Sequence, residues 1–497
     1  MTRPTLSLRY FTLVGMPVAL LLLPVLPLSA FAMQALDDHD MASVAGQSGI
    51  AIDITSNDPD GRLISTGSIR YTEYDRDGQG QDYLEIDGLT LRTLITNEQG
   101  QVVGVDTITT TINVDAGGNV SIKNRDINTL DLEVGAISLS GRTLIGGARL
   151  SVWQFVGDSY LETALLNDID GVRVALRTVM EAGSGLTYQF DEDGLTFSTD
   201  VIFIPATGET AFRSELFLSG SNDELRLEFG DTTGGIEIKN ITLLDEQGDP
   251  LFGSNNFGDL GYSDIRINTG YLTLAANRDA TKDGLQGVIN ADVNVGTAFY
   301  RTGDQRLNLR DVQLRTNGEL AYEMDLIDTG FTTGIETRIT DIHNLDLIIG
   351  AMTLSAGDGS AESLSMGRYA IENLTVEGGV SLGLYTLPGA GSQGMRLDMS
   401  MDGSAQFDLT IIDDVVAEGM PQPKLTAEVV MNNVSVAQTF DQTRKGLHIG
   451  VIDTSMDMNI NAIHMGDGVQ QQGQTGRLVM NNVALQPGSY FRIEPLQ

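Results

Sequence analysis

LEIDGLTL, residues 84–91, is the stretch that decides the fold, because its apolar residues alternate with polar ones on both sides of a central Asp-Gly step. Alternation with a period of two is typical of a strand with one buried and one solvated face. The unit recurs as IEIKNITL (236–243), LNLRDVQL (307–314), AIENLTV (370–376), VVMNNVSV (429–436) and LVMNNVAL (478–485). Each copy has Gly, Asp or Asn at its centre. These residues tolerate unusual backbone angles, so each copy predicts a strand with a bend or bulge.

The rest of the chain has the same character. Its 497 residues include 57 glycines and only 12 prolines, and short Gly, Asp and Asn clusters separate the alternating segments. Many turns and few prolines favour many strands. We therefore predict an all-β protein built of elongated antiparallel sheets, sandwich-like or prism-like. An irregular β-solenoid is the alternative.

A longer match relates two distant parts of the chain. LDLEVGAISLS at 130–140 parallels LDLIIGAMTLS at 345–355, and the units at 84–91 and 307–314 precede them in the same order. Recurrence of this kind indicates a duplication in which related strands share a continuous core. We therefore predict two related β-rich halves, residues 49–255 and 256–497.

The first 32 residues have the pattern of an export signal. Arg3 and Arg9 precede the apolar run 11–28, and Ala30-Phe31-Ala32 provides a small-residue cleavage site. Three prolines interrupt the run, which favours a cleaved signal peptide (1–32) over a membrane anchor. We expect export through the Sec pathway to the periplasm, the outer-membrane surface or the medium, and no membrane-spanning segment in the mature chain.

Residues 33–48 predict a short capped helix before the first strand. Asp37 is suited to the N-cap position and Asp40 to the first turn, where a carboxylate interacts favourably with the helix dipole. Leu36 and Met41 have the spacing of a hydrophobic staple, and Gly46 is a natural stop. The predicted helical turns cover residues 38–45.

Charge and cysteine content exclude several classes of protein. The formal charge of −37 argues against nucleic acid as a partner, because phosphate binding depends on Lys and Arg. The absence of cysteine excludes disulfides, zinc-thiolate sites and a cysteine nucleophile. The four histidines, His39, His343, His448 and His464, have no metal-ligand spacing, and no nucleophile elbow or phosphate loop occurs. We therefore predict that the chain is not an enzyme and holds no certain cofactor.

Calcium is the small ligand that the sequence favours most, although the sequence pattern of the candidate site is weak. The candidate ligands are Asp75, Asp77, Gln79, Gln81 and Asp82, which follow the oxygen spacing of an EF-hand-like loop with Gly80 at the turn position. The loop lacks the final glutamate, because Ile86 stands there, and it leads into a strand instead of a helix. The simpler interpretation is an acidic hairpin turn.

The opening L-D-D-x-x-M-x-x-V-x-G-Q-x-G-I, at 36–50, resembles exported gamma-proteobacterial proteins of pilus systems of the Fil type. The resemblance implies a Gram-negative cell-envelope or surface-fibre role with no defined catalytic residues. We therefore expect a non-catalytic envelope protein, a pilus- or filament-system component or an adhesin, that contacts other envelope proteins by strand pairing. The alternatives are an envelope protein that binds an apolar ligand and a carbohydrate-active β protein.

Overall fold

The computed structural model describes residues 50–74, 81–96, 102–125, 127, 129–168, 171–192, 194–221, 224–277, 284–328, 333–340, 342–356, 364–386, 395–413, 422–466 and 476–495. This part forms 31 strands and no helix, so the predicted all-β class is confirmed. No helix in this part is long and apolar enough to cross a membrane. The expected signal peptide and the helix at 38–45 lie outside the described residues.

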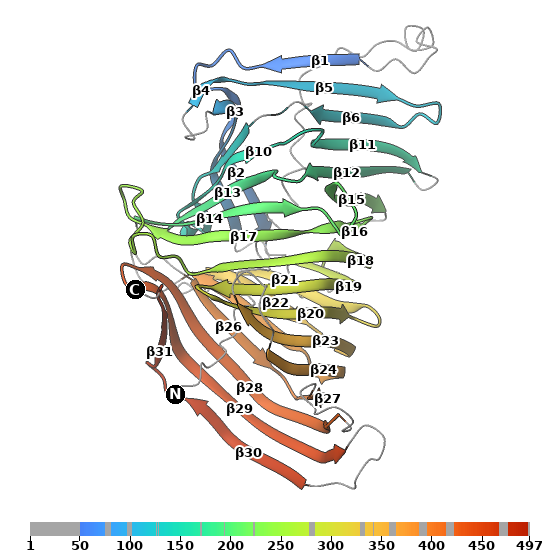
Figure 1. Cartoon of the computed structure of the whole chain (residues 1–497), viewed down its shortest axis with the longest axis vertical. Coiled ribbons are helices and arrows are strands. Elements are labelled where there is room, and N and C mark those ends of the chain that lie inside the picture. Colours follow the sequence, from blue (N-terminus) through green and yellow to red (C-terminus); the bar gives the residue numbers. More distant parts are fainter. Residues whose placement is uncertain are drawn as a thin grey trace.

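The strands form two walls that run along the long axis of the molecule (Figure 1). Wall A comprises β1 (Ile50–Thr55), β5 (Thr107–Val114), β6 (Val120–Arg125), β11 (Tyr160–Asp168), β12 (Gly171–Glu181), β15 (Ala211–Ser221), β16 (Glu224–Phe229), β21 (Leu320–Asp328), β22 (Thr333–Ile339), β25 (Val380–Thr386), β26 (Met395–Met401) and β31 (Tyr490–Ile493). Wall B comprises β2 (Arg62–Tyr74), β3 (Gln81–Thr96), β7 (Thr129–Val134), β10 (Gly147–Gln154), β13 (Gly185–Glu192), β14 (Leu195–Ile204), β17 (Thr233–Leu244), β20 (Gln305–Arg315), β23 (Ile342–Ala356), β24 (Leu364–Glu377), β27 (Ser404–Ile412) and β30 (Gly476–Leu485). Three short strands, β4 (Val102–Val105), β8 (Ile137–Leu139) and β9 (Arg142–Ile145), extend the pairing around β3.

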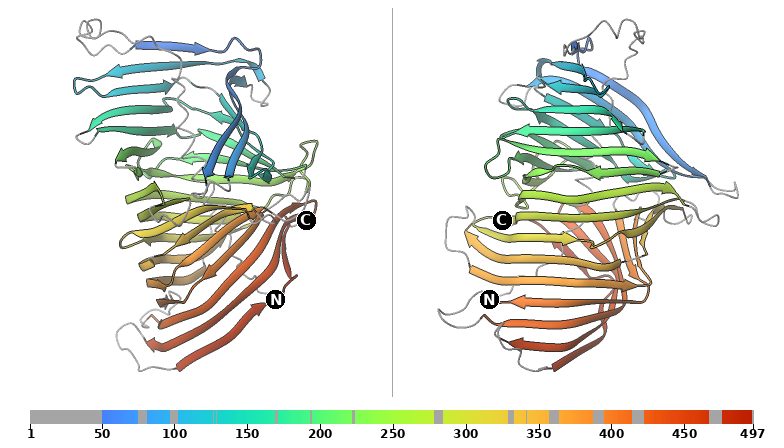
Figure 2. Two further views of the ribbon diagram at one scale, coloured as in Figure 1. Left: turned by 180° about the vertical axis from the view of Figure 1, so that it is seen from behind. Right: turned by 90° about the vertical axis from the view of Figure 1, so that its right-hand side faces the viewer.

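Four long strands join the walls: β18 (Asp259–Ala276), β19 (Leu285–Thr302), β28 (Lys424–Thr443) and β29 (Gly446–Gly466). The first part of β18 pairs with β17 in wall B, and its last part pairs with β16 in wall A. The line along which the two walls meet is called the seam. The strand ends that lie away from the seam are called the rims. In the C-terminal half the strands of the two walls run in different directions (Figure 2).

Every strand pairing recorded among the described residues is antiparallel. The chain adds strands alternately to the two walls, as when it passes from β22 in wall A to β23 and β24 in wall B and then to β25 in wall A. This elongated antiparallel arrangement confirms the predicted architecture, and the described part shows no solenoid.

The polar step of the repeated unit is a left-handed residue that keeps all the apolar side chains on one face. The φ angles are 74° at Gly88, 54° at Asn240, 52° at Asp311, 57° at Asn373, 53° at Asn433 and 53° at Asn482. Ile238 and Ile241 flank Asn240 and are 6% and 7% exposed in the same core cluster. A strict period of two would place residues three apart on opposite faces. The predicted bend is therefore confirmed, and its effect is to shift the alternation by one residue.

The asparagines at these steps also tie neighbouring strands together. The main-chain N–H of Asn240 donates to Asp259 on β18 at 3.1 Å, and its side-chain amide donates to Asp200 on β14 at 2.8 Å. Asn373 repeats this arrangement with aspartates on its own two neighbouring strands, at 2.9 Å in each case. Each of these asparagines therefore links its own strand to the strands on both sides.

The two long sequence matches pair in equivalent ways. In the N-terminal half, Leu91 on β3 lies opposite Leu132 on β7. In the C-terminal half, their counterparts Leu314 on β20 and Leu347 on β23 also lie opposite each other. The same local pairing therefore occurs at both places, while the boundaries of the two halves, 49–255 and 256–497, stay a prediction.

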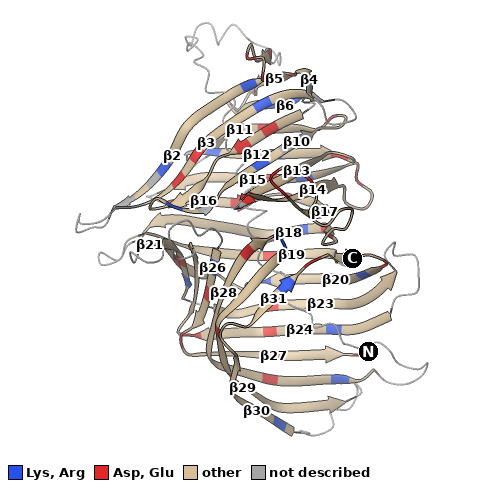
Figure 3. Ribbon diagram, turned by 90° about the vertical axis from the view of Figure 1, so that its left-hand side faces the viewer, with Lys and Arg blue, Asp and Glu red and all other residues tan. Residues whose placement is uncertain are grey.

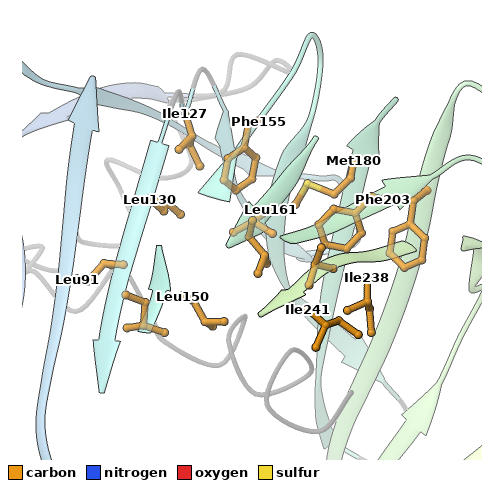
Figure 4. Packing of buried hydrophobic residues seen from close by; sticks show 14 of the residues in the cluster. Leu91, Ile127, Leu130, Leu150, Phe155, Leu161, Met180, Phe203, Ile238 and Ile241 are labelled. Atoms are coloured by element: carbon orange, nitrogen blue, oxygen red, sulfur yellow. The ribbon is translucent and has the colours of Figure 1, made fainter. Parts of the chain in front are cut away.

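A filled hydrophobic core lies in the N-terminal half. Leu130, Leu150, Phe203 and Ile241 belong to it, and their side chains converge from several strands (Figure 4). Burying apolar surface contributes about 25 cal/mol for each Å² removed from water, so this cluster is the main source of stability in that half. The C-terminal half has a smaller buried cluster, which lies at the seam.

Candidate functional site

The strand β30 is a free edge at one end of the long axis (Figure 1). Within the described residues it pairs with β29 alone. Its exposed apolar side chains are Leu478 at 46%, Val479 at 46%, Val483 at 40% and Leu485 at 42%. An edge strand presents unpaired N–H and C=O groups, and contiguous exposed apolar residues mark interaction surfaces. The β30 edge is therefore one candidate site.

The strand β1 is a free edge at the opposite end of the molecule (Figure 1). It pairs with β5 alone in the part that the structure describes, and it exposes 37% of Ile52. The charges of the two edges are opposite in sign. β30 carries Arg477 and no acidic residue, whereas β1 carries Asp53 and leads into a turn with Asp58 and Asp60. Elsewhere acidic and basic residues are spread over both halves without gathering into one patch (Figure 3).

The inner face of the C-terminal half is a second candidate site. At the seam, side chains of both walls pack together, including Leu320 and Ile339 from wall A and Ile342 and Val376 from wall B. The apolar faces of the two walls therefore face one interior. Along wall B the inner positions are apolar throughout: Leu307, Leu309, Val312 and Leu314 on β20, Leu345, Leu347 and Ile349 on β23, and Leu409 and Ile411 on β27.

This inner face is open where its counterpart in the N-terminal half is filled. Leu91 and Leu132 are only 3% and 5% exposed in the N-terminal core. Their counterparts Leu314 and Leu347 are 39% and 36% exposed. The chain thus keeps leucine at positions that its own described residues leave more than a third exposed, and exposed apolar surfaces of this kind are candidate binding surfaces.

Three polar side chains interrupt the apolar lining of wall A close to its rim. Thr333 on β22 and Thr386 on β25 are each 2% exposed, and Gln442 on β28 is 8% exposed. All three lie on the inner face by the period of two. Thr333 stands six positions from Ile339 and Thr386 six positions from Val380, and both of those residues pack at the seam. Gln442 stands six positions from Val436, which follows the left-handed step of β28 and lies opposite Met399. Their side-chain hydroxyl and amide groups have no hydrogen-bond partner among the described residues. A buried polar group without a partner costs about 1–3 kcal/mol, so these positions need an explanation.

The predicted calcium loop lies outside the described residues, except for the backbone of Gln81 and Asp82 in β3. Tyr74 pairs with Gln81 and Glu73 pairs with Asp82, so the segment between them connects two antiparallel neighbours. The interpretation as a hairpin connection is confirmed. Asp75, Asp77 and Gln79 lie outside the described residues, so their role as ligands stays a prediction. Among the described residues no group of three or more His, Asp or Glu is placed to hold a metal ion.

The described histidines do not come together. His343 is the second residue of β23, whereas His448 and His464 lie toward opposite ends of β29. His448 lies 3.5 Å from Asp441, and its ring stacks beside Tyr490 at a centroid distance of 5.1 Å. Burial raises the pKa of Asp441 above its ordinary value, and the hydrogen bond to His448 opposes this shift. This pair belongs to the pairing of β28 with β29, and the prediction that the chain is not an enzyme stays a prediction.

Sequence reasoning did not locate the open inner face or the β30 edge. Nothing in the alternating pattern distinguishes Leu347 from Leu132, because both follow the same local sequence rule. The difference arises from what packs over each wall. For the edge, the sequence offered only a weak signal, a C-terminal unit rich in apolar residues and free of acids.

Comparison with known proteins adds one local similarity. Residues 13–130 match the model of a family of unknown function (DUF6160). In the described part this match covers β1 to β6 and the first residues of β7. No curated protein and no solved structure matches the chain.

Proposed function

We propose that the chain is a non-catalytic structural subunit of the cell envelope that assembles head to tail by strand pairing, as a filament-system component or adhesin would. The observation that carries the proposal is the free, apolar β30 edge. Four large hydrophobic side chains there are at least 40% exposed on one strand, although the chain as a whole is strongly acidic.

A second copy of the chain is the partner that this edge fits. The β1 edge lies at the other end of the long axis, so a contact between β30 of one copy and β1 of the next leaves a β1 edge available at one end of the pair and a β30 edge at the other (Figure 1). Such a heterologous contact does not close on itself and generates filaments. Arg477 on one edge and Asp53 on the other add electrostatic complementarity.

Two variants test the contact from its two sides. Val479→Lys with Val483→Lys places charges on the β30 edge, and Ile52→Lys with Asp53→Lys places charges on the β1 edge. Lysine on an edge strand opposes the approach of another strand. Sedimentation velocity should show multimers of the wild-type chain and monomers of each variant. A mixture of the two variants should form dimers and stop there, because each contributes one intact edge.

The control is Leu165→Lys on β11. Leu165 is 42% exposed, but β11 has partner strands on both sides, so this variant should assemble as the wild type does. Normal assembly of the β30 variant would disprove the proposal. Failure of the mixture to form dimers would also disprove head-to-tail pairing.

A further inference from the structure

We infer that the inner face of the C-terminal half binds a neutral acyl ester, with its hydrocarbon chain along wall B and its polar group beside Thr333 and Thr386. This inference is independent of strand pairing at β30. It rests on two observations. Leu314 and Leu347 in the apolar lining of wall B are 39% and 36% exposed, and the hydroxyl groups of Thr333 and Thr386 on wall A, which face the same interior, have no hydrogen-bond partner among the described residues.

The lining suits a hydrocarbon chain. No Asp, Glu, Lys or Arg stands at the inner positions of β20, β23 and β27, where Leu314 and Leu347 lie directly opposite each other. On wall B the strands β20, β23, β24, β27, β28 and β29 lie side by side in this order. Neighbouring strands lie about 4.8 Å apart, so these six strands offer an apolar strip of about 24 Å. Binding sites for apolar ligands have this composition, with a few polar groups that fix the orientation.

The polar groups define the other end of the ligand. Thr386 is the last residue of β25 and Thr333 the first of β22, so they lie next to each other on paired strands, since Gly334 pairs with Tyr385. Both threonines are 2% exposed, so this part of the interior is covered. The strand β25 contacts β9 of the N-terminal half, and β21, the neighbour of β22, contacts β3.

Hydroxyl and amide groups donate and accept hydrogen bonds without carrying charge. Burying a free carboxylate or phosphate beside them would leave a charge without a counter-ion, at a large desolvation cost. An ester and its free hydroxyl groups satisfy Thr333 and Thr386 at no such cost. The structure therefore favours an acyl ester over a fatty acid or a phospholipid headgroup.

The experiment measures binding of monopalmitoylglycerol and of palmitate to the full chain by isothermal titration calorimetry. We expect monopalmitoylglycerol to bind at least tenfold more tightly than palmitate. Leu347→Glu should abolish binding of both, because it places a charge in the apolar strip. The matched control is Ile348→Glu, one residue further on the opposite face of β23, which should bind as the wild type does.

Two further variants test the polar end. Thr386→Val and Thr333→Val keep the side-chain volume and remove the hydroxyl group. They should reduce the preference for monopalmitoylglycerol over palmitate while leaving the circular dichroism spectrum unchanged. Equal binding of the two probes by the wild type would overturn the assignment of the polar end. If neither probe bound to the wild-type chain, the inference as a whole would be overturned. It would also be overturned if Ile348→Glu lost binding in the same way as Leu347→Glu.

Discussion

Replacing Asn240 by Ala and by Gly separates the two contributions of the left-handed step. Asn240 has a φ of 54°, and its side-chain amide donates to Asp200 at 2.8 Å. Glycine adopts this conformation without strain, so Asn240→Gly should lose only the hydrogen bond, about 1 kcal/mol. Alanine loses the same hydrogen bond and pays a further ~1–2 kcal/mol for the left-handed backbone. We therefore expect Asn240→Ala to destabilise the chain by about 2–3 kcal/mol.

The assay is urea unfolding followed by tryptophan fluorescence and circular dichroism, with the midpoints compared at equal slope. Asn294→Ala, on the regular strand β19, is the control and should cost less than about 0.5 kcal/mol. Asn373 has the same arrangement of two aspartates, so its Ala and Gly variants should follow the same order. If the Ala variant of Asn240 were as stable as the Gly variant, the left-handed step would not be what keeps Ile238 and Ile241 on one face.

Three other predictions concern charge and pH. Asp131 is 1% exposed and accepts two hydrogen bonds from Arg149, so Asp131→Ala should cost about 2–3 kcal/mol in urea unfolding. The N–H of Asn482 is the largest cause that holds the pKa of Asp457 below its ordinary value. The ionised carboxylate of Asp457 contributes stability that is present above the unfolded pKa and is lost as pH falls through the folded pKa. Asp457→Asn should therefore flatten the acid limb of a curve of stability against pH. Burial raises the pKa of Tyr262 to about 12, so stability is intact below the unfolded value of about 10 and should fall as pH rises from there to 12, with Tyr262→Phe reducing that fall.

The sequence predicted the strands because the strand pattern is local. The unit at 236–243 shows alternation on each side of its Asn, and the turns between units contain the residues that turns require. The bend at Asn240 was also predictable, since few residues other than Gly, Asn and Asp adopt a positive φ. The matched segments at 130–140 and 345–355 further indicated that related strands would pair in related ways.

The candidate sites were not predictable in this way. Leu132 and Leu347 stand in matching sequences, and both point to the inner face of wall B. One is buried at 5% and the other is 36% exposed, because exposure depends on the segments that pack over a wall. Those segments are far away in sequence, and no local pattern records them.

The sequence by itself determined that this protein is an antiparallel β structure with one apolar face on each strand, because alternation and turn chemistry act between neighbouring residues. Only the tertiary structure decided which apolar faces are filled. It also decided that, among the described residues, β30 and β1 each pair on one side only and Thr333 and Thr386 lie buried without hydrogen-bond partners. The physical reason is that burial and strand pairing are satisfied by residues distant along the chain. The left-handed residue at the centre of each unit relates the local pattern to the tertiary structure. Its type can be recognised in the sequence, and its conformation directs the apolar side chains on both sides of it toward the same interior.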